Sequence, residues 1–277
     1  MNIAIISSLK DKASINIKEN LINNFNFNKL EEQFDNNKIY QYAINDENIK
    51  LYTINSDLIN AENIGKEIDA DLFIFISKHK AKDERKSLTA HVPGNFGKNE
   101  MGGKEKTLCI APAAYLKNIF IELDKNCQDS EYESSLEVTH HGPFLEKPVL
   151  FVEIGSSEKE WEDKNAGNTI AQSVIDAMKK DNKNFNEKGV FIIGGSHYNH
   201  VGNKVMLKSD FAVGHICAKY NLENLDESLI RQAMKKTIPE AKFVLLDWKG
   251  LGKEKQRILE ILEKNGIKYE RGDKIFD

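Results

Sequence analysis

The chain contains six short apolar runs, and these runs limit its possible folds more than any other feature. They are rich in β-branched and aromatic residues, which favour strands, and most of them do not alternate between apolar and polar positions. A strand without such alternation is covered on both faces, as in a parallel or mixed sheet packed between helices. The runs are residues 2–8, 71–77, 107–112, 148–155, 189–195 and 242–248.

Helical patterns lie between the later runs. Residues 165–180, 224–236 and 252–266 are amphipathic at helical spacing, and the last of them ends at Gly266, a residue type favoured just beyond a helix. Strands that alternate with helices indicate an α/β fold, which we predict to be a mixed, mostly parallel sheet flanked by helices. Because the sequence contains no internal repeat and no long low-complexity linker, we predict a single domain over residues 1–277.

The composition excludes several classes of protein. Hydrophobic residues make up 40% of the chain and charged residues 30%, as in ordinary globular proteins. No stretch reaches the roughly 18 uncharged apolar residues of a membrane helix, and the brief N-terminal apolar run is better explained as a strand than as a signal peptide. Three cysteines without a CxxC pair argue against a disulfide framework and a cysteine zinc site. We therefore expect a cytoplasmic protein that does not associate with membranes.

Residues 78–106 form a basic, glycine-rich stretch. It carries seven Lys and one Arg against four Asp or Glu, a net charge of +4 in a chain whose net charge is −4. We expect a long loop here, and loops of this length are usually functional or disordered. A basic loop can contact phosphate groups even on an acidic protein. A solvated loop has the same composition, so charge alone does not decide between the two.

Most of the seven histidines lie near the ends of predicted strands. His79 follows one of these strands, and His197 and His200 follow another. Ligands bind at the carboxyl ends of strands in open α/β sheets. If these strands are parallel neighbours of the strand that carries Glu153, the three imidazoles and the carboxylate converge. A buried carboxylate needs a partner, either a cation or metal or a lysine or backbone donor. Only His215 has the apolar surroundings of a core residue.

Two histidine pairs favour different local structures. His140 and His141 are adjacent, and adjacent residues on a strand point to opposite faces. The following Gly142-Pro143 favours a loop, in which we expect one imidazole to face the site while the other orients it or packs away. His197 and His200 form H-x-x-H, a spacing that on a helix puts both rings on one face, where they can bind one metal. This motif is weak by itself, and the sequence contains no HExxH, P-loop or GxSxG motif.

Five segments taken together resemble the archaeal and plant type of D-aminoacyl-tRNA deacylase. In chain order they are SKHKAKDERKSLTAHVPGNF (77–96), EVTHHGP (137–143), FVEIGSSEKEW (151–161), GGSHYNH (194–200) and VGHICAKY (213–220). The similarity extends over essentially the whole chain. It implies a zinc-dependent enzyme of translation quality control that hydrolyses the ester between a D-amino acid and tRNA, releasing both. It also implies an α/β fold similar to that of the phosphorylase and peptidyl-tRNA hydrolase group.

The resemblance and the histidine positions together predict one site. A metal ion can polarise an ester carbonyl and make a bound water nucleophilic. We expect the metal ligands to come from His91, His140, His197 and His200. The groups expected to act as a base or to orient a ligand are Glu137, Glu153 and His141. The expected tRNA contacts are Lys78, Lys80, Lys82, Arg85 and Lys86, with Phe96 as a stacking surface or as ordinary loop packing.

Two other functions remain open at this point. One is a zinc peptidase or amidohydrolase that acts on small peptides, although such substrates would not need the basic stretch. The other is a non-catalytic RNA-binding module whose histidines are structural. Loss of a bound metal together with activity would exclude the module, and salt-sensitive tRNA binding would exclude the peptidase. The sequence predicts no oligomeric state, although a monomer is favoured, and it does not explain how L-amino acids would be rejected.

Overall fold

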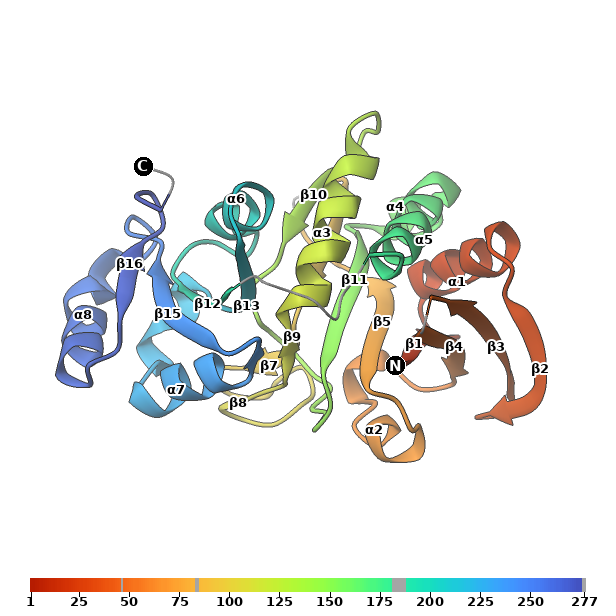
Figure 1. Cartoon of the computed structure of the whole chain (residues 1–277), viewed down its shortest axis with the longest axis horizontal. Helices are drawn as coiled ribbons and strands as arrows, with labels where there is room; N and C mark the ends of the chain where they lie inside the picture. The colour runs from red at the N-terminus through yellow and green to blue at the C-terminus, as the bar shows by residue number, and fades with distance from the viewer. Residues whose placement is uncertain (46, 83–84, 181–187, 276–277) are drawn as a thin grey trace.

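Two sheets lie side by side along the long axis of the molecule (Figure 1). The computed structural model describes residues 1–45, 47–82, 85–180 and 188–275. The larger sheet has eight strands in the spatial order β10 (Glu133–Leu136), β6 (Ser87–His91), β11 (Val149–Gly155), β5 (Leu72–Lys78), β1 (Asn2–Ser8), β4 (Glu47–Ile54), β3 (Asn37–Ile44) and β2 (Asn28–Phe34). The smaller sheet has the order β13 (Phe211–Cys217), β12 (Lys188–Ile193), β15 (Ala241–Leu246) and β16 (Tyr269–Arg271).

The strand directions confirm the predicted fold class. Strands β11, β5, β1 and β4 run parallel to one another in the larger sheet, and all pairs in the smaller sheet are parallel. Strand β6 is antiparallel to β11, and β2 and β3 are added as an antiparallel pair at the far edge. The protein is therefore a mixed, mostly parallel α/β structure.

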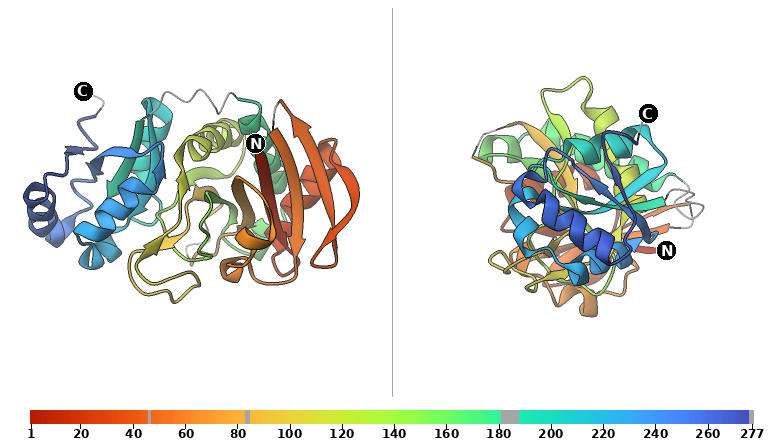
Figure 2. Two further views of the ribbon diagram at one scale, coloured as in Figure 1. Left: turned by 60° about the horizontal axis from the view of Figure 1, so that its bottom comes forward. Right: turned by 90° about the vertical axis from the view of Figure 1, so that its left-hand side faces the viewer.

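Helices cover the sheets along their length. α1 (Lys12–Asn24), α5 (Lys164–Met178) and α3 (Ala113–Cys127) pack side by side over the larger sheet, as Figure 1 shows. The remaining α-helices are α2 (Ile64–Glu67), α4 (Glu158–Trp161), α6 (His200–Lys208), α7 (Glu227–Lys235) and α8 (Lys255–Lys264). Figure 2 shows α8 and the N-terminal strands at opposite ends of the molecule. Among the described residues, no helix has both the length and the apolar content needed to cross a membrane.

The smaller sheet shows why its strands are continuously apolar. Successive residues of a strand point to opposite faces, and here each face meets a different hydrophobic core. Ile192 and Leu245 pack into the core shared with the larger sheet. Phe191 and Leu246 pack into a second core with residues of α7 and α8. Both faces are therefore buried, as the apolar runs predict.

Three expectations about the strands are wrong. The stretch 78–106 is not one long loop, because β6 is a buried strand between β10 and β11. Residues 107–112 form two separate short strands, β8 (Thr107–Leu108) and β9 (Ala111–Pro112), which pair with β7 (Gly94–Asn95) and β14 (Thr237–Ile238). Strand β12 belongs to the smaller sheet and is not a neighbour of β5.

Candidate functional site

The carboxyl ends of three parallel strands meet at one pocket of about 390 Å³. Ser8 ends β1, Lys78 ends β5 and Glu153 lies near the end of β11, and all three line this pocket. The site thus lies where ligands bind in open α/β sheets. We call it the histidine pocket, because His79, His140, His141 and His197 also line it.

Five histidines and two glutamates gather at the base of the histidine pocket. They form three groups of three residues. Within each group, the potential ligand atoms lie within 4.8 Å of one another. Because His91 and Glu137 each belong to two groups, the groups make one continuous cluster. The groups are His91, His140 and His141; His79, Glu137 and His197; and His91, Glu137 and Glu153.

Strand register places part of this cluster on one face of the larger sheet. Ser77 of β5 lies opposite Glu153 of β11, and His91 of β6 lies opposite Phe151. Phe151 and Glu153 are two residues apart and so share a face. The sheet therefore presents Ser77, His91 and Glu153 together, although they come from three different strands.

An irregular segment supplies the remaining residues. The backbone N–H of Val138 donates to the carbonyl of His197 at 3.0 Å, which brings the segment after β10 to the segment after β12. His141 has a left-handed φ of 45°, which is uncommon outside glycine and interrupts the alternation of side chains. The rings of His140 and His141 both lie beside His91, with centroids 4.3 and 4.8 Å away. The predicted loop is confirmed, but both imidazoles face the site instead of one.

Glu137 is the carboxylate at the centre of the cluster. Its Oε2 accepts a hydrogen bond from His197 Nε2 at 2.8 Å and lies 3.5 Å from His140 Nε2. Its Oε1 lies 3.1 Å from His79 Nδ1, an ion-pair contact without hydrogen-bond geometry. Burial alone would raise the pKa of Glu137, but His197 and His79 hold it well below its ordinary value. The side chain is therefore a buried carboxylate.

Glu153 is the second ionised carboxylate. It accepts a short hydrogen bond from the Ser77 hydroxyl, and its Oε2 lies 3.5 Å from His79 Nδ1 and 3.7 Å from His91 Nε2. Burial would raise the pKa of Glu153, but the two histidines lower it. Burial likewise would lower the pKa of His79, whereas its contacts with both carboxylates raise it to about 11. His79 is therefore a cation between two anions at neutral pH.

His140 and His141 are held in the form that binds metals. Nδ1 of His140 lies 2.8 Å from the Val138 carbonyl oxygen, and Nδ1 of His141 lies 2.6 Å from that of Gly142. A carbonyl only accepts, so Nδ1 carries the proton and Nε2 keeps a free electron pair. Burial, together with neighbouring histidines, lowers the pKa of His140 well below its ordinary value and that of His141 to about 4. Both rings are neutral at physiological pH.

Unsatisfied polar atoms show that the cluster fits a metal ion. Among the described residues, the buried His79 Nε2, both ring nitrogens of His91 and Glu137 Oε1 have no hydrogen-bond partner. Each such atom costs about 1–3 kcal/mol when buried alone, and native proteins contain few of them. Imidazole and carboxylate ligands are the donors that zinc prefers. A cation bound between His91 and Glu137 would satisfy unsatisfied atoms of both residues at once.

Comparison with known proteins places the chain in a family. A sequence profile described as D-aminoacyl-tRNA deacylase matches residues 66–270. The chain is also 36% identical over 273 residues to a D-aminoacyl-tRNA deacylase of Pyrococcus furiosus, covering 96% of this chain and 98% of that protein. The chain belongs to the D-aminoacyl-tRNA deacylase family.

Other members of this deacylase family and one solved structure match over the same length. A D-aminoacyl-tRNA deacylase of Methanocaldococcus jannaschii is 37% identical over 285 residues, covering 98% of this chain and all of that protein. A crystal structure described as a conserved protein of unknown function superposes with a TM-score of 0.86 and 31% identity, covering 100% of this chain and 96% of that one. The family resemblance predicted from the motifs is thus confirmed.

The predicted metal ligands of this deacylase family member do not all lie in the histidine and glutamate cluster. His91, His140 and His197, predicted as ligands, belong to it. Glu137, Glu153 and His141, which were predicted as catalytic residues, lie in the same cluster. His79 also belongs to the cluster and was missing from the predicted set of ligands. Its position just after a predicted strand was the one sequence signal that it belongs to the site. The two carboxylates that it contacts, Glu137 and Glu153, lie far along the chain, so the sequence could not show these contacts.

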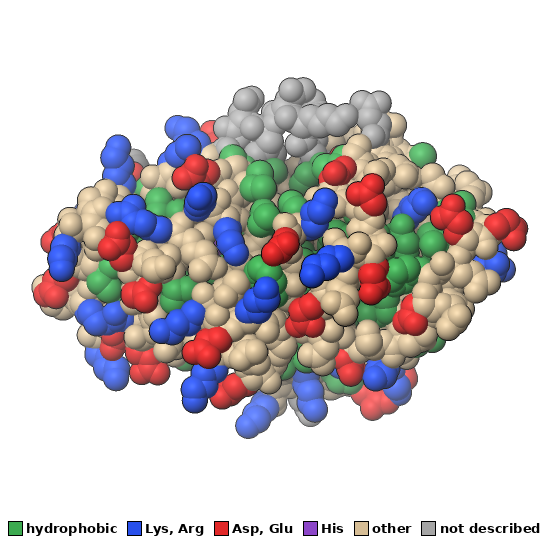
Figure 3. Space-filling view, turned by 90° about the horizontal axis from the view of Figure 1, so that it is seen from below, with side chains coloured by type: hydrophobic (Ala, Val, Ile, Leu, Met, Phe, Trp, Pro, Cys, Tyr) green, Lys and Arg blue, Asp and Glu red, His purple; other side chains and the backbone are tan. Residues whose placement is uncertain are grey.

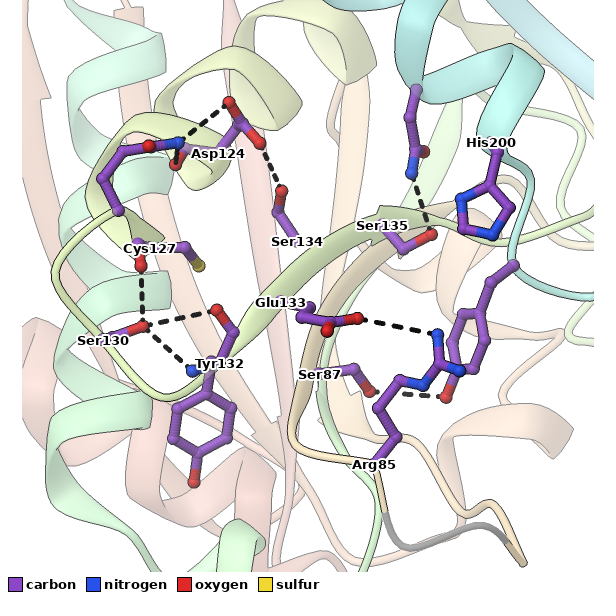
Figure 4. Close-up of a pocket in the computed structure, with 13 residues that line it drawn as sticks. Arg85, Ser87, Asp124, Cys127, Ser130, Tyr132, Glu133, Ser134, Ser135 and His200 are labelled. Carbon is purple, nitrogen blue, oxygen red and sulfur yellow. Dashed lines mark hydrogen bonds and ion pairs between the residues drawn. The ribbon is translucent and has the colours of Figure 1, made fainter.

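The prediction that His200 is a ligand is wrong. The helix α6 begins only at His200, so His197 precedes the helix and the two rings do not share a helical face. Figure 4 shows His200 in a separate pocket with Arg85 and Ser87. The imidazole belongs to none of the groups of potential ligands among the described residues.

The predicted tRNA contacts divide into three sets. Lys78 and Lys80 line the histidine pocket, whereas Lys82 is exposed outside it. Arg85 and Lys86 form ion pairs with Glu133 and Glu131, and Figure 4 shows the first of these pairs.

The prediction that Phe96 is a stacking surface is wrong. Its side chain is 1% exposed, and its ring stacks on Phe191 in the second hydrophobic core. The alternative that Phe96 packs within the fold is confirmed. His215 is likewise a core residue, held by Thr139 and by the Cys109 carbonyl.

Proposed function

We propose that this protein is a metal-dependent hydrolase that cleaves the ester between a D-amino acid and tRNA and releases both. The observation that supports it most directly is the buried cluster of two ionised carboxylates and five histidines, which contains unsatisfied ligand atoms and lies at the base of an open pocket. A structural role alone would leave these atoms without partners. The family of the chain supports the choice of substrate.

His91, His140 and His141 would hold the metal with three neighbouring imidazoles. His79, Glu137 and His197 form a second, ion-paired group beside them. Zinc held there would polarise an ester carbonyl and help to activate water as the nucleophile.

Glu153 is the residue best placed to move protons. It lines the histidine pocket, whereas Glu137 lies beneath it. The Ser77 hydroxyl holds one carboxylate oxygen of Glu153, so Oε2 can take the proton of the attacking water. The water oxygen bonds to the ester carbonyl carbon, the bond from that carbon to the ribose oxygen breaks, and the same proton passes to the ribose oxygen that leaves. Glu137 orients His197 and His79 through its two oxygens.

Lysines at the pocket provide the attraction for tRNA. Lys10, Lys78 and Lys80 line the histidine pocket, and the ammonium of Lys78 lies 5.5 Å from the centre of the Trp161 ring. The face of the molecule in Figure 3 carries interspersed Lys, Arg, Asp and Glu side chains without a broad area of one sign. We expect phosphate contacts at the pocket, where these lysines lie beside the histidine cluster.

The direct test uses two tRNAs charged with the D- and the L-form of one amino acid. Zinc-loaded protein is expected to release the D-amino acid and to leave the L-form largely intact, measured as loss of acid-precipitable label. Equal rates on both forms, or no cleavage of either, would contradict the proposal. Cleavage of small peptides without cleavage of charged tRNA would instead support a peptidase.

Replacing Lys78 and Lys80 together by glutamine should raise KM for charged tRNA more than it lowers kcat. Each phosphate contact contributes to affinity independently of the chemistry, and its loss reduces the salt slope of binding by about one. Steady-state kinetics at several salt concentrations measures both quantities. Lys86→Gln is the matched control, because its ammonium pairs with Glu131 outside the pocket. An unchanged salt slope in the double variant would remove these lysines from the tRNA contact.

A further inference from the structure

Tyr220 presents an exposed aromatic ring at the edge of the histidine pocket. It lies in the 3₁₀ helix η2 (Lys219–Asn224) and is 56% exposed, one of only a few large hydrophobic side chains exposed to this extent among the described residues. Its hydroxyl lies 3.3 Å from His197 Nδ1. Because His197 Nε2 donates to Glu137, Nδ1 is the ring nitrogen left to accept from the Tyr220 hydroxyl. The tyrosine is thus fixed at its hydroxyl end while its ring remains open.

A second exposed apolar side chain lies at the same opening. Met101 is 57% exposed and lines the histidine pocket. Its carbonyl accepts a hydrogen bond from the N–H of Gly142 at 2.9 Å, directly after His141. The segment that carries Met101 also packs against η2, since a Cβ added at Gly97 would lie 2.8 Å from the Asn224 side chain. The apolar opening therefore adjoins the histidine cluster.

The contact with His197 explains the position of the hydroxyl but not the exposure of the ring. An aromatic ring held at one end with an open face is suited to stacking, and every nucleobase has a face that stacks on it. Lysines lie near the ring. Lys219 is exposed and precedes Tyr220 in the sequence, and Lys78 and Lys80 line the histidine pocket. An aromatic surface combined with lysines is typical of sites for single-stranded nucleic acid.

We infer that the Tyr220 ring stacks on the nucleobase of the 3′-terminal nucleotide of tRNA, while its hydroxyl positions His197. The inference rests on the proposed function. The scissile ester is attached to the ribose of that nucleotide, so an ester at the cluster brings the base of the same nucleoside to the edge of the pocket. Tyr220 contacts a cluster residue and lies at this edge.

Binding can be measured without hydrolysis. An uncharged RNA oligonucleotide ending in CCA, with 2-aminopurine as its last base, loses fluorescence when that base stacks. Tyr220→Phe keeps the ring and should bind as the wild type does, whereas Tyr220→Ala should bind roughly tenfold more weakly with less quenching. Leu207→Ala removes another exposed apolar side chain, on α6, and should change nothing. Equal binding and quenching by Tyr220→Ala and the wild type would overturn the inference.

Kinetics separates the base contact from the effect on His197. The two substrates are an adenosine ester and a methyl ester of one D-amino acid. Tyr220→Ala should raise KM for the adenosine ester well beyond any change for the methyl ester. Tyr220→Phe should lower kcat for both esters and leave KM for the adenosine ester unchanged. An equal loss by Tyr220→Ala on both esters would assign the ring to the amino acid and overturn the inference. If the wild type cleaves neither ester nor charged tRNA, the proposed function fails, and the binding experiment still decides the role of Tyr220.

Discussion

Glu137→Gln is expected to reduce turnover of D-aminoacyl-tRNA about 10- to 100-fold, the range seen when a residue that orients metal ligands is lost. Glutamine has nearly the same shape, so the cavity is preserved. It lacks the negative charge that contacts His79, His140 and His197. Both carboxylate oxygens of Glu137 face imidazole N–H groups, of His197 and His79. An amide has only one oxygen, so its N–H₂ group would face one of these donors and that contact would be lost. Single-turnover kinetics with zinc-loaded protein measures the loss.

A matched control separates this effect from general damage. Glu47 is also a buried glutamate, and it accepts a hydrogen bond from the Tyr115 hydroxyl at 2.9 Å in a different part of the larger sheet. Glu47→Gln should retain wild-type turnover even if its free energy of unfolding falls. Urea denaturation shows whether both variants remain folded. Wild-type turnover by Glu137→Gln would remove this carboxylate from the site.

The strands of the core could be predicted because their signal is local. Five of the six apolar runs are strands. They could be recognised because a strand buried on both faces is continuously apolar and shows no alternation of apolar and polar residues. Strand β6 gave no such signal, because it is short, contains Ser87, Thr89 and His91, and follows a basic segment. Its place in the sheet comes from pairing with β10 and β11 on either side. The assignment of β12 to a second sheet was equally out of reach, because pairing depends on partners far along the chain.

The site shows the same division between local and distant information. Glu137, His140 and His141 were predicted from the family resemblance together with the histidine positions, and the structure brings all three into the cluster. His200 was chosen on helical spacing, and the prediction failed because the helix begins at His200, three residues too late to include His197. Phe96 appeared to belong to an open loop, but its ring packs on Phe191 from the smaller sheet. Motif spacing identifies candidate residues, whereas tertiary contacts decide which of them converge.

Removing the metal with a chelator is expected to abolish turnover and to lower the melting temperature. Without a cation, buried atoms of His91 and Glu137 have no hydrogen-bond partner among the described residues. A ligand at about 1,000 times its Kd stabilises the folded state by roughly 4 kcal/mol. Since about 1 kcal/mol shifts Tm by roughly 2–4 °C in chains of 150–250 residues, the expected fall is on the order of 10 °C.

Metal content, melting temperature and turnover should change together. Zinc added back to the stripped wild type should restore turnover and Tm, with elemental analysis giving the bound amount. Glu137→Gln removes a member of two of the three ligand groups and should therefore show a much smaller zinc-dependent shift in Tm. Glu47→Gln should respond to zinc as the wild type does, because its carboxylate lies outside all three groups. Full turnover by protein shown to be metal-free would contradict a metal-dependent site and would leave Glu153 and the histidines to act alone.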